Sequence, residues 1–288
     1  MKKGKNFGII CGDDRQIAMI DSLVKDGNKV YIYGFDKKEV SKKAIKTDMY
    51  SLIENSGYIV LPFPVTKDLV TLNAPFSSEL VFLDDDFANA LKNKKVFCGL
   101  SEKLKEVSSI WGKLEILDYT KREDFAFYNA VPTVEGAIEI AINNTSKTIY
   151  GSNCLVSGFG RIGKILSKTL GSMGANVTVS ARKLEDLSFI HVLGYKPILT
   201  SKIKDYNHHD IIFNTIPFLI FSEDILKRLD KDTLIIDLAS LPGGIDFKSA
   251  KKLKIRAIHA LALPGQVAPY TAGEIMKTTI CNMIKEGI

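Results

Sequence analysis

The feature that most constrains this chain is a glycine-rich turn in its second half. The apolar residues Leu155 and Val156 lead into Gly158-Phe159-Gly160-Arg161-Ile162-Gly163, and residues 164–173 continue with helical spacing. A strand, a Gly-x-Gly-x-x-Gly turn and a helix start in this order bind the pyrophosphate of a dinucleotide. Such a turn also occurs without a ligand, but the strand before it and the helix after it favour binding. All six residues of the turn are therefore predicted cofactor contacts.

The end of the next predicted strand indicates which dinucleotide is bound. About 20 residues after the turn, enzymes that use NAD place an acidic residue on the ribose hydroxyls. This chain instead reads Ser180-Ala181-Arg182-Lys183. A guanidinium suits a 2′-phosphate, so the sequence predicts NADP, although a solvated surface pair would read the same. Two further predicted contacts are Leu238 and the turn Thr215-Ile216-Pro217, which could equally be a helix entry with proline in its first turn.

Length and composition set broad limits on the protein. The chain has 288 residues, of which 45% are hydrophobic and 25% charged, and a formal net charge of +6. This length fits two domains. The lysines are scattered, which is poor evidence for nucleic-acid binding and suits small anions. We find no signal peptide and no apolar run of membrane-spanning length, so a cytoplasmic protein is expected. The four cysteines are far apart and are interpreted as reduced thiols: Cys11, Cys98, Cys154 and Cys281.

Strand and helix signals alternate through both halves of the chain. This rhythm predicts two doubly wound α/β domains, each with a parallel sheet covered on both faces. We expect a flavodoxin-like substrate domain in residues 1–130 and a Rossmann NADP-binding domain in residues 152–270. Residues 131–151 are expected to form a helix between them, with Pro132 interrupting the helical pattern of 120–144. Residues 271–288 should form a helix that returns to the first domain.

Two loops of the first domain follow predicted strands, where ligands of parallel sheets bind. In Gly12-Asp13-Asp14-Arg15-Gln16, Arg15 could clamp a substrate carboxylate, or Asp13 could simply cap a helix. The second loop carries Thr66 and Lys67 after two prolines. Its hydroxyl and ammonium groups suit the same anionic substrate, although a plain surface turn is the competing interpretation.

Proline and glycine are dense in two segments of the second half, residues 237–244 and 263–273. That density predicts a fixed irregular backbone, which we expect to form the wall of a cleft between the domains. The predicted substrate contacts in the second segment are Pro264, Gly265, Gln266 and Thr271.

The histidines offer little chemistry. His208-His209-Asp210 has no third metal ligand nearby, so we expect a solvent-exposed loop and no metal site. His259 ends a predicted strand and is the histidine that could act as an acid or base. The candidate catalytic residues are therefore His259, Thr271 and Asp13, and none of them stands out.

Four stretches together resemble one enzyme family, in order and nearly end to end: residues 12–16, 61–66, 158–163 and 263–273. The family is the A subunit of dipicolinate synthase, and the closing Pro-Gly-x-x-Ala-Pro-x-Thr-Ala-Gly run is its most specific part. The resemblance implies an NADP-dependent oxidation of a cyclic dihydro- or tetrahydrodipicolinate-type intermediate of the lysine pathway to dipicolinate. It also implies a flavoprotein-like second subunit and the mother-cell cytoplasm of a sporulating bacterium. Separately, we expect the chain to form a homo-oligomer.

Two other functions stay open. An amino- or keto-acid dehydrogenase resembling alanine dehydrogenase would share the two-domain architecture. A non-catalytic NADP-binding regulatory module would share the glycine turn but has no use for the carboxylate-binding loops of the first domain.

Overall fold

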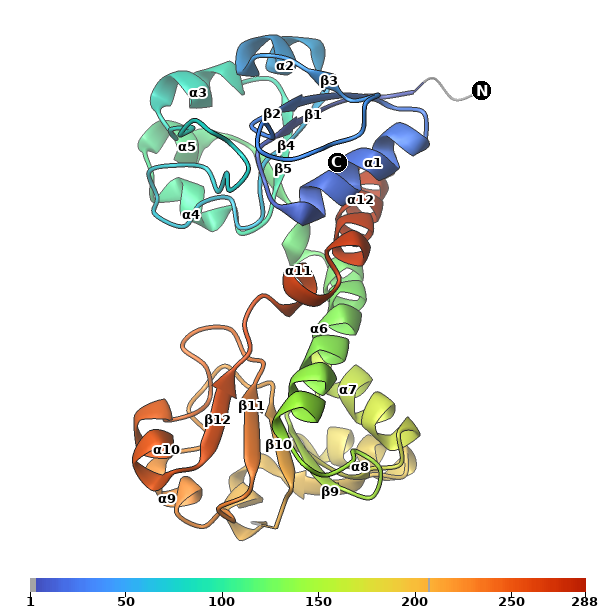
Figure 1. The fold of residues 1–288 in the computed structure, drawn as a ribbon, viewed down its shortest axis with the longest axis vertical. Coiled ribbons are helices and arrows are strands. Elements are labelled where there is room, and N and C mark those ends of the chain that lie inside the picture. Colours follow the sequence, from blue (N-terminus) through green and yellow to red (C-terminus); the bar gives the residue numbers. More distant parts are fainter. Residues whose placement is uncertain (1–3, 207) are drawn as a thin grey trace. The chain divides into compact units, whose positions relative to one another are not determined.

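The chain folds into two compact units. A computed structural model describes residues 4–206 and 208–288 (Figure 1). Unit 1 comprises the residues up to Tyr128 together with Ala268–Ile288, and unit 2 comprises Asn129–Val267. The chain therefore passes between the units twice.

Unit 1 is built on a six-stranded parallel sheet. Its strands are β1 (Asn6–Ile10), β2 (Lys29–Tyr33), β3 (Ile45–Lys46), β4 (Tyr58–Val60), β5 (Lys95–Cys98) and β6 (Ile116–Asp118). Their order is β3-β2-β1-β4-β5-β6, and every pairing is parallel. Without the two-residue edge strand β3, the remaining five strands have the 2-1-3-4-5 order of flavodoxin-like sheets.

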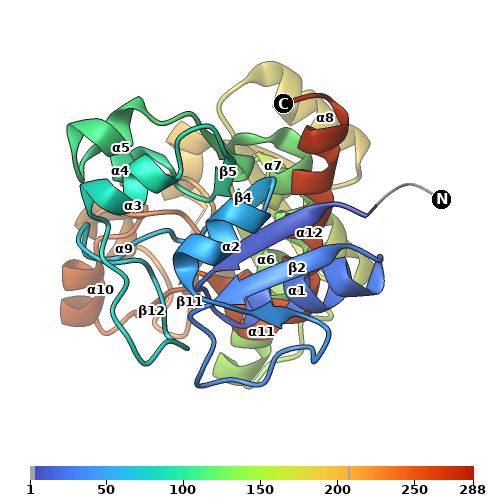
Figure 2. The same ribbon diagram turned by 90° about the horizontal axis from the view of Figure 1, so that it is seen from above.

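Helices cover both faces of this sheet because alternate strand residues point to opposite sides. Phe7 and Ile9 pack with residues of α1 (Asp14–Lys25) and α12 (Pro269–Lys285), whereas Ile10 packs with residues of α2 (Met49–Asn55) and α3 (Asp85–Ala90). In Figure 2, β2 lies beside β1, the darker blue strand that leads in from the N-terminus. The unit also contains α4 (Glu102–Lys105), α5 (Ser109–Lys113) and a 3-10 turn at Tyr119–Lys121.

Unit 2 contains the second parallel sheet. Its strands are β7 (Asn153–Ser157), β8 (Asn176–Ala181), β9 (Lys196–Leu199), β10 (Ile211–Asn214), β11 (Leu234–Asp237) and β12 (Arg256–His259). The order β12-β11-β10-β7-β8-β9 is that of a Rossmann dinucleotide-binding sheet. The helices of this unit are α7 (Arg161–Ser172), α8 (Leu184–Val192), α9 (Glu223–Leu226), α10 (Phe247–Leu253) and α11 (Leu263–Val267), with a 3-10 turn at Thr200–Asp205. The predicted pair of doubly wound sheets is confirmed.

The expected break at Pro132 is wrong. A single helix, α6, runs from Glu123 to Asn144 with Pro132 inside it, and the unit boundary falls within it. Proline in a helix interior costs about 3 kcal/mol through its missing N–H and its steric clash. The next two turns bury Val134, Ala137 and Ala141 in the core of unit 2. This packing offsets the local cost and keeps the helix continuous.

The segment predicted to be irregular, residues 263–273, is helical for most of its length. Leu263–Val267 forms α11, and α12 begins at Pro269, where a proline in the first turn lacks only an N–H that has no helical partner. Gly136 of α6 gives α11 room, since a Cβ there would lie 3.1 Å from Val267 Cγ1. The predicted C-terminal helix packs on α1 in unit 1, as expected (Figure 1).

The contact between α1 and α12 depends on Gly273. A Cβ added there would lie 2.3 Å from the carbonyl oxygen of Arg15 and 2.8 Å from Ala18 Cβ. We expect Gly273→Ala to lower the free energy of unfolding by about 1–3 kcal/mol, measured by urea denaturation, because the two helices must separate. The matched control is Gly112→Ala in α5, where the nearest atom is 4.0 Å away. Equal stabilities of the two variants would contradict this account of the packing.

Candidate functional site

The glycine turn has the geometry that the motif predicts. Gly158 has a φ of +102°, which favours glycine. A Cβ at Gly163 would lie 2.1 Å from the carbonyl oxygen of Gly158, so only glycine lets α7 approach β7 this closely. A Cβ at Gly160 would meet no atom within 4 Å. Gly160 is also the N-cap of α7, with no side-chain cap, so the space beside it suits an anion at the helix N-terminus.

The residues around the turn are held firmly. Phe159 is buried and packs edge-on against Phe189, with ring centroids 6.0 Å apart. The backbone N–H of Gly158 donates to the carbonyl oxygen of Ser180 at 3.1 Å, and Ser180 is fully buried. Ile162 is half-buried and packs on the core of unit 2. These contacts anchor the turn to the end of β8 and to the core of unit 2.

The predicted 2′-phosphate contacts lie at the end of β8. Ala181 is buried as its last residue, and Arg182 and Lys183 are exposed. Lys183 Nζ lies 3.1 Å from Glu185 Oε1. Among the described residues, no carboxylate pairs with Arg182, so its guanidinium is available to a ligand.

The Thr215-Ile216-Pro217 segment lies against the glycine turn. A Cβ at Gly158 would be 2.4 Å from Thr215 Oγ1 and 2.9 Å from Ile216 Cγ1. Thr215 donates its hydroxyl to the carbonyl oxygen of Ser157 at 2.8 Å. The alternative of a helix entry is wrong, because the next helix, α9, begins only at Glu223. Leu238, the last predicted cofactor contact, is buried directly after β11.

Sequence reasoning missed the side chain that links these segments. Asp237, at the end of β11, is fully buried and accepts a hydrogen bond from Asn214 Nδ2 at 2.8 Å. The two residues are 23 positions apart, and only the pairing of β10 with β11 brings them together. The sequence did contain a signal for this residue, namely an acidic side chain at the end of an apolar strand.

In unit 1, the side chains of Arg15 and Asp13 form a salt bridge. Arg15 donates from Nε to Asp13 Oδ1 at 3.0 Å and from Nη2 to Asp13 Oδ2 at 2.7 Å. Nη2 also contacts the carbonyl oxygen of Phe63, and the guanidinium lies 4.7 Å from the centre of the Phe63 ring. Asp13 caps α1 as well, in a capping box with Gln16. Within the described chain, Nη1 alone of the three guanidinium nitrogens has no acceptor.

In the loop after β4, some polar side chains are buried and hydrogen-bonded within the loop, and others are exposed to solvent. Thr66 is fully buried, and its hydroxyl is bonded to Asp68 and to the backbone of Leu69. Backbone N–H donors of Thr71 and Val70 hold the pKa of Asp68 well below its usual range. Lys67 is exposed. Lys103, which the sequence did not single out, donates to the carbonyl oxygen of Thr66 at 3.2 Å.

The remaining predicted site residues differ in accessibility. Pro264 is buried, Gly265 is half-buried, and Gln266 is exposed and donates to the carbonyl oxygen of Leu261 at 3.1 Å. Thr271 is exposed in the first turn of α12. His259 Nε2 lies 3.1 Å from the carbonyl oxygen of Ala239. Because a carbonyl only accepts, this nitrogen carries the proton.

Comparison with known proteins gives close relatives. Residues 6–110 match the family model of the N-terminal domain of the dipicolinate synthase A subunit. The A subunit of dipicolinate synthase from Bacillus subtilis is 36% identical over 99% of this chain and 98% of its own length. Its crystal structure has a TM-score of 0.89 and covers 99% of this chain and 97% of that one. The Bacillus halodurans protein, at 32% identity, has a TM-score of 0.88 and covers 98% of both chains.

A more distant structure shares only the fold. An L-alanine dehydrogenase is 11% identical and has a TM-score of 0.65 over 96% of this chain and 88% of that one. The two-sheet architecture thus occurs in proteins with little sequence in common.

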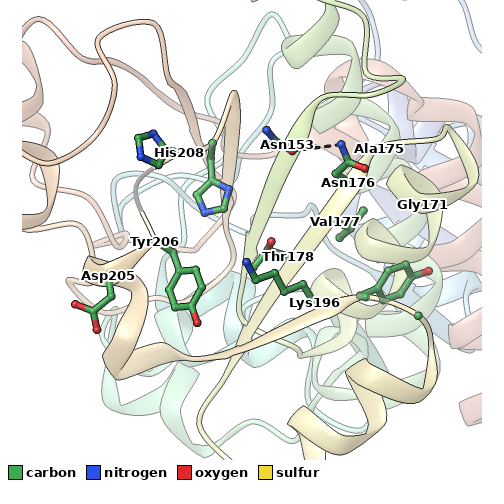
Figure 3. A pocket seen from close by; sticks show the side chains of 13 residues that line it. Asn153, Gly171, Ala175, Asn176, Val177, Thr178, Lys196, Asp205, Tyr206 and His208 are labelled. Atoms are coloured by element: carbon green, nitrogen blue, oxygen red, sulfur yellow. Dashed lines mark hydrogen bonds between the residues drawn. The ribbon is translucent and has the colours of Figure 1, made fainter.

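A cavity lies at the opposite, amino-terminal edge of the second sheet. It measures about 610 Å³ and is lined by residues at the starts of β7, β8 and β9 (Figure 3). Lys196 Nζ lies 5.0 Å from the centre of the Tyr206 ring, and Asn176 donates to Asn153 at 3.3 Å. Ligands of parallel sheets bind at the carboxyl edge, so this cavity is not the predicted cofactor site.

His209, which also lines this cavity, corrects the expectation of an exposed loop. His208 is exposed, but His209 is only 8% exposed, and neither of its ring nitrogens has a hydrogen-bond partner. Burial lowers the pKa of His209 to about 4. The loop turns inward because Ile211 and Ile212, just beyond it, enter the core. No group of three potential metal ligands occurs in residues 4–206 and 208–288, and no helix there is long and apolar enough to cross a membrane.

Burial of neutral His209 makes stability depend on pH. Between its ordinary pKa of 6.5 and about 4, the unfolded chain binds a proton that the folded chain does not. Stability therefore falls as the pH drops through this window, by up to about 3 kcal/mol. Urea denaturation at several pH values should show this loss in the wild type and in the exposed-site control His208→Gln, but not in His209→Leu. Parallel pH profiles of His209→Leu and the wild type would refute the assignment.

Proposed function

The chain belongs to the family of dipicolinate synthase A subunits, and from this premise we propose that it is an NADP-dependent oxidoreductase that forms dipicolinate. Its substrate is a cyclic dihydro- or tetrahydrodipicolinate-type intermediate of the lysine pathway. The observation that carries the proposal is the open N-terminus of α7 at Gly160, followed by the unpaired Arg182 at the end of β8.

Unit 2 holds the cofactor in this proposal. The N-terminus of α7 and the backbone at Gly160 bind the pyrophosphate, and Arg182 with Lys183 binds the 2′-phosphate. Thr215, Ile216, Pro217 and Leu238 line the other half of the dinucleotide, beyond Gly158. A carboxylate at position 182 would repel a 2′-phosphate, so the arginine favours NADP over NAD.

Unit 1 holds the dicarboxylate. Arg15 follows β1, and Lys67 follows β4, the neighbouring strand in the sheet. One substrate carboxylate takes the hydrogen bond of Arg15 Nη1, and the other pairs with Lys67, supported by Lys103. The Arg15–Asp13 pair fixes the guanidinium on Phe63 so that Nη1 is pre-oriented. Thr271 of unit 1 is exposed and supplies a further polar contact, whereas buried Thr66 shapes its loop.

Oxidation of the dihydro form to dipicolinate removes one hydride and one proton from the ring, whereas the tetrahydro form must lose two of each and would reduce two NADP. When bound, NADP would supply the hydride acceptor, and the residues of unit 2 named above would hold it. Asp13 is held by Arg15 and by the N-terminus of α1, and Nε2 of His259 is bonded to the carbonyl oxygen of Ala239, so the proposal assigns the proton to neither Asp13 nor Nε2 of His259. The product is aromatic, which supplies much of the driving force, and we propose that the proton leaves to water. The protein thus acts by orientation and by binding charge.

The proposal also includes partners. The relatives are named as one subunit of a synthase, so we propose that a second, flavoprotein-like subunit binds this chain and that the chain itself forms a homo-oligomer. We place the enzyme in the mother-cell cytoplasm of a sporulating bacterium.

The test is an assay with the purified chain, with and without the second subunit. The product of dihydrodipicolinate synthase is supplied with NADP or with NAD, and the reduced nucleotide and dipicolinate are both measured. We expect reduction of NADP with an equal amount of dipicolinate, and at least 10-fold lower kcat/KM with NAD, a loss of about 1.4 kcal/mol of binding energy from the 2′-phosphate.

The assay also separates the competing functions. Nucleotide reduction with alanine instead of the cyclic substrate would favour an amino-acid dehydrogenase. NADPH binding without turnover of any substrate, even with the second subunit present, would favour a regulatory module and overturn the proposal.

A further inference from the structure

The carboxylate of Asp237 accepts hydrogen bonds from three donors. Its Oδ1 accepts from Asn214 Nδ2 at 2.8 Å and from the backbone N–H of Ala239 at 3.2 Å. Its Oδ2 accepts from the backbone N–H of Gly244 at 2.8 Å. The side chain is 0% exposed. A buried carboxylate is costly unless donors surround it, and here both oxygens are used.

The side chain of Asn214 connects Asp237 to the segment beside the glycine turn through hydrogen bonds. Its Nδ2 also donates to the carbonyl oxygen of Ile216 at 2.9 Å, and its Oδ1 accepts from the N–H of Ile216 at 3.3 Å. The side-chain amide of Asn214 is thus bonded to both backbone polar groups of Ile216. Ile216 in turn lies beside Gly158, where an added Cβ would be 2.9 Å from Ile216 Cγ1. Asp237 therefore fixes the orientation of the amide that places Ile216.

The segment after Asp237 also packs against Asn214 and Ile216, at Gly244. A Cβ at Gly244 would lie 2.3 Å from Asn214 Nδ2 and 2.6 Å from the carbonyl oxygen of Ile216. His259 adds a bond from Nε2 to the carbonyl oxygen of Ala239 at 3.1 Å, and its ring stacks on Phe247 with centroids 5.3 Å apart. The carboxyl ends of β10, β11 and β12 are in this way tied together.

We infer that Asp237 is a positioning residue for the half of the dinucleotide that reaches beyond Gly158 toward β10 and β11. It sets the backbone of residues 215–217 and 239–244, and it leaves the adenosine half, at the ends of β7 and β8, unaffected. This inference rests on the proposed function, because it takes the glycine turn to bind a dinucleotide. The two halves of a dinucleotide lie on opposite sides of the central strand in such a sheet.

Asp237→Asn is the informative variant. It keeps the size of the side chain but replaces one oxygen with an amide donor, which must then face the N–H of Gly244 or the amide of Asn214. We expect the Kd for NADP to rise on the order of 10-fold and kcat to fall by at least that factor. The Kd for adenosine 2′,5′-bisphosphate, which ends before the affected segments, should stay within about 2-fold of the wild-type value.

The matched control is Asp246→Asn. Asp246 is a carboxylate of the same unit that caps α10 through Ser249, and asparagine caps a helix equally well. This variant should bind both ligands as the wild type does. Gly244→Ala is a second, independent disturbance of the same point, and it should weaken NADP but not adenosine 2′,5′-bisphosphate.

Equal weakening of both ligands in Asp237→Asn and Gly244→Ala would mean that Asp237 serves only general stability, and the inference would be wrong. Unchanged NADP binding and kcat in Asp237→Asn would also overturn it. Failure of the wild type to bind NADP at all would instead count against the proposed function. Binding of both ligands without turnover still leaves the difference between them measurable.

Discussion

The close approach of α7 to β7 is the contact on which the candidate site depends. The backbone of Gly163 lies so near the carbonyl oxygen of Gly158 that a Cβ would be 2.1 Å away. This contact directs the N-terminus of α7 at the space beside Gly160. It also brings Gly158 against Thr215 and Ile216, so that the network around Asp237 borders the same turn. Gly158 thus links the proposed pyrophosphate site to the segments beyond it.

The two sheets have similar scaffolds but differ at the helix that follows the first strand. Both have the strand order of a doubly wound fold, and in both a helix follows the first strand. In unit 1 the N-terminus of α1 is already occupied by the carboxylate of Asp13, with Arg15 bound to it. A phosphate there would meet a negative charge. In unit 2 the equivalent position is Gly160, which leaves the helix N-terminus open.

Much of this fold could be predicted from local sequence patterns. The alternation of strand and helix signals correctly predicted two doubly wound parallel sheets and a C-terminal helix that packs on the first of them. Local patterns failed where packing between distant residues decides the structure. Pro132 stays helical because the next turns of α6 are buried, and His209 turns inward because its strand enters the core. The Asn214–Asp237 pair needs the register of β10 and β11, which no single segment contains.

Substitution of Gly160 by alanine tests the central claim most directly, namely that the space at the N-terminus of α7 holds the cofactor pyrophosphate. The added methyl group meets no protein atom within 4 Å, so the free energy of unfolding should change by less than about 1 kcal/mol. The Kd for NADP, measured by calorimetry, should rise at least 10-fold, because the methyl group occupies the position of the phosphates. An unchanged Kd in a stable Gly160→Ala protein would contradict the account.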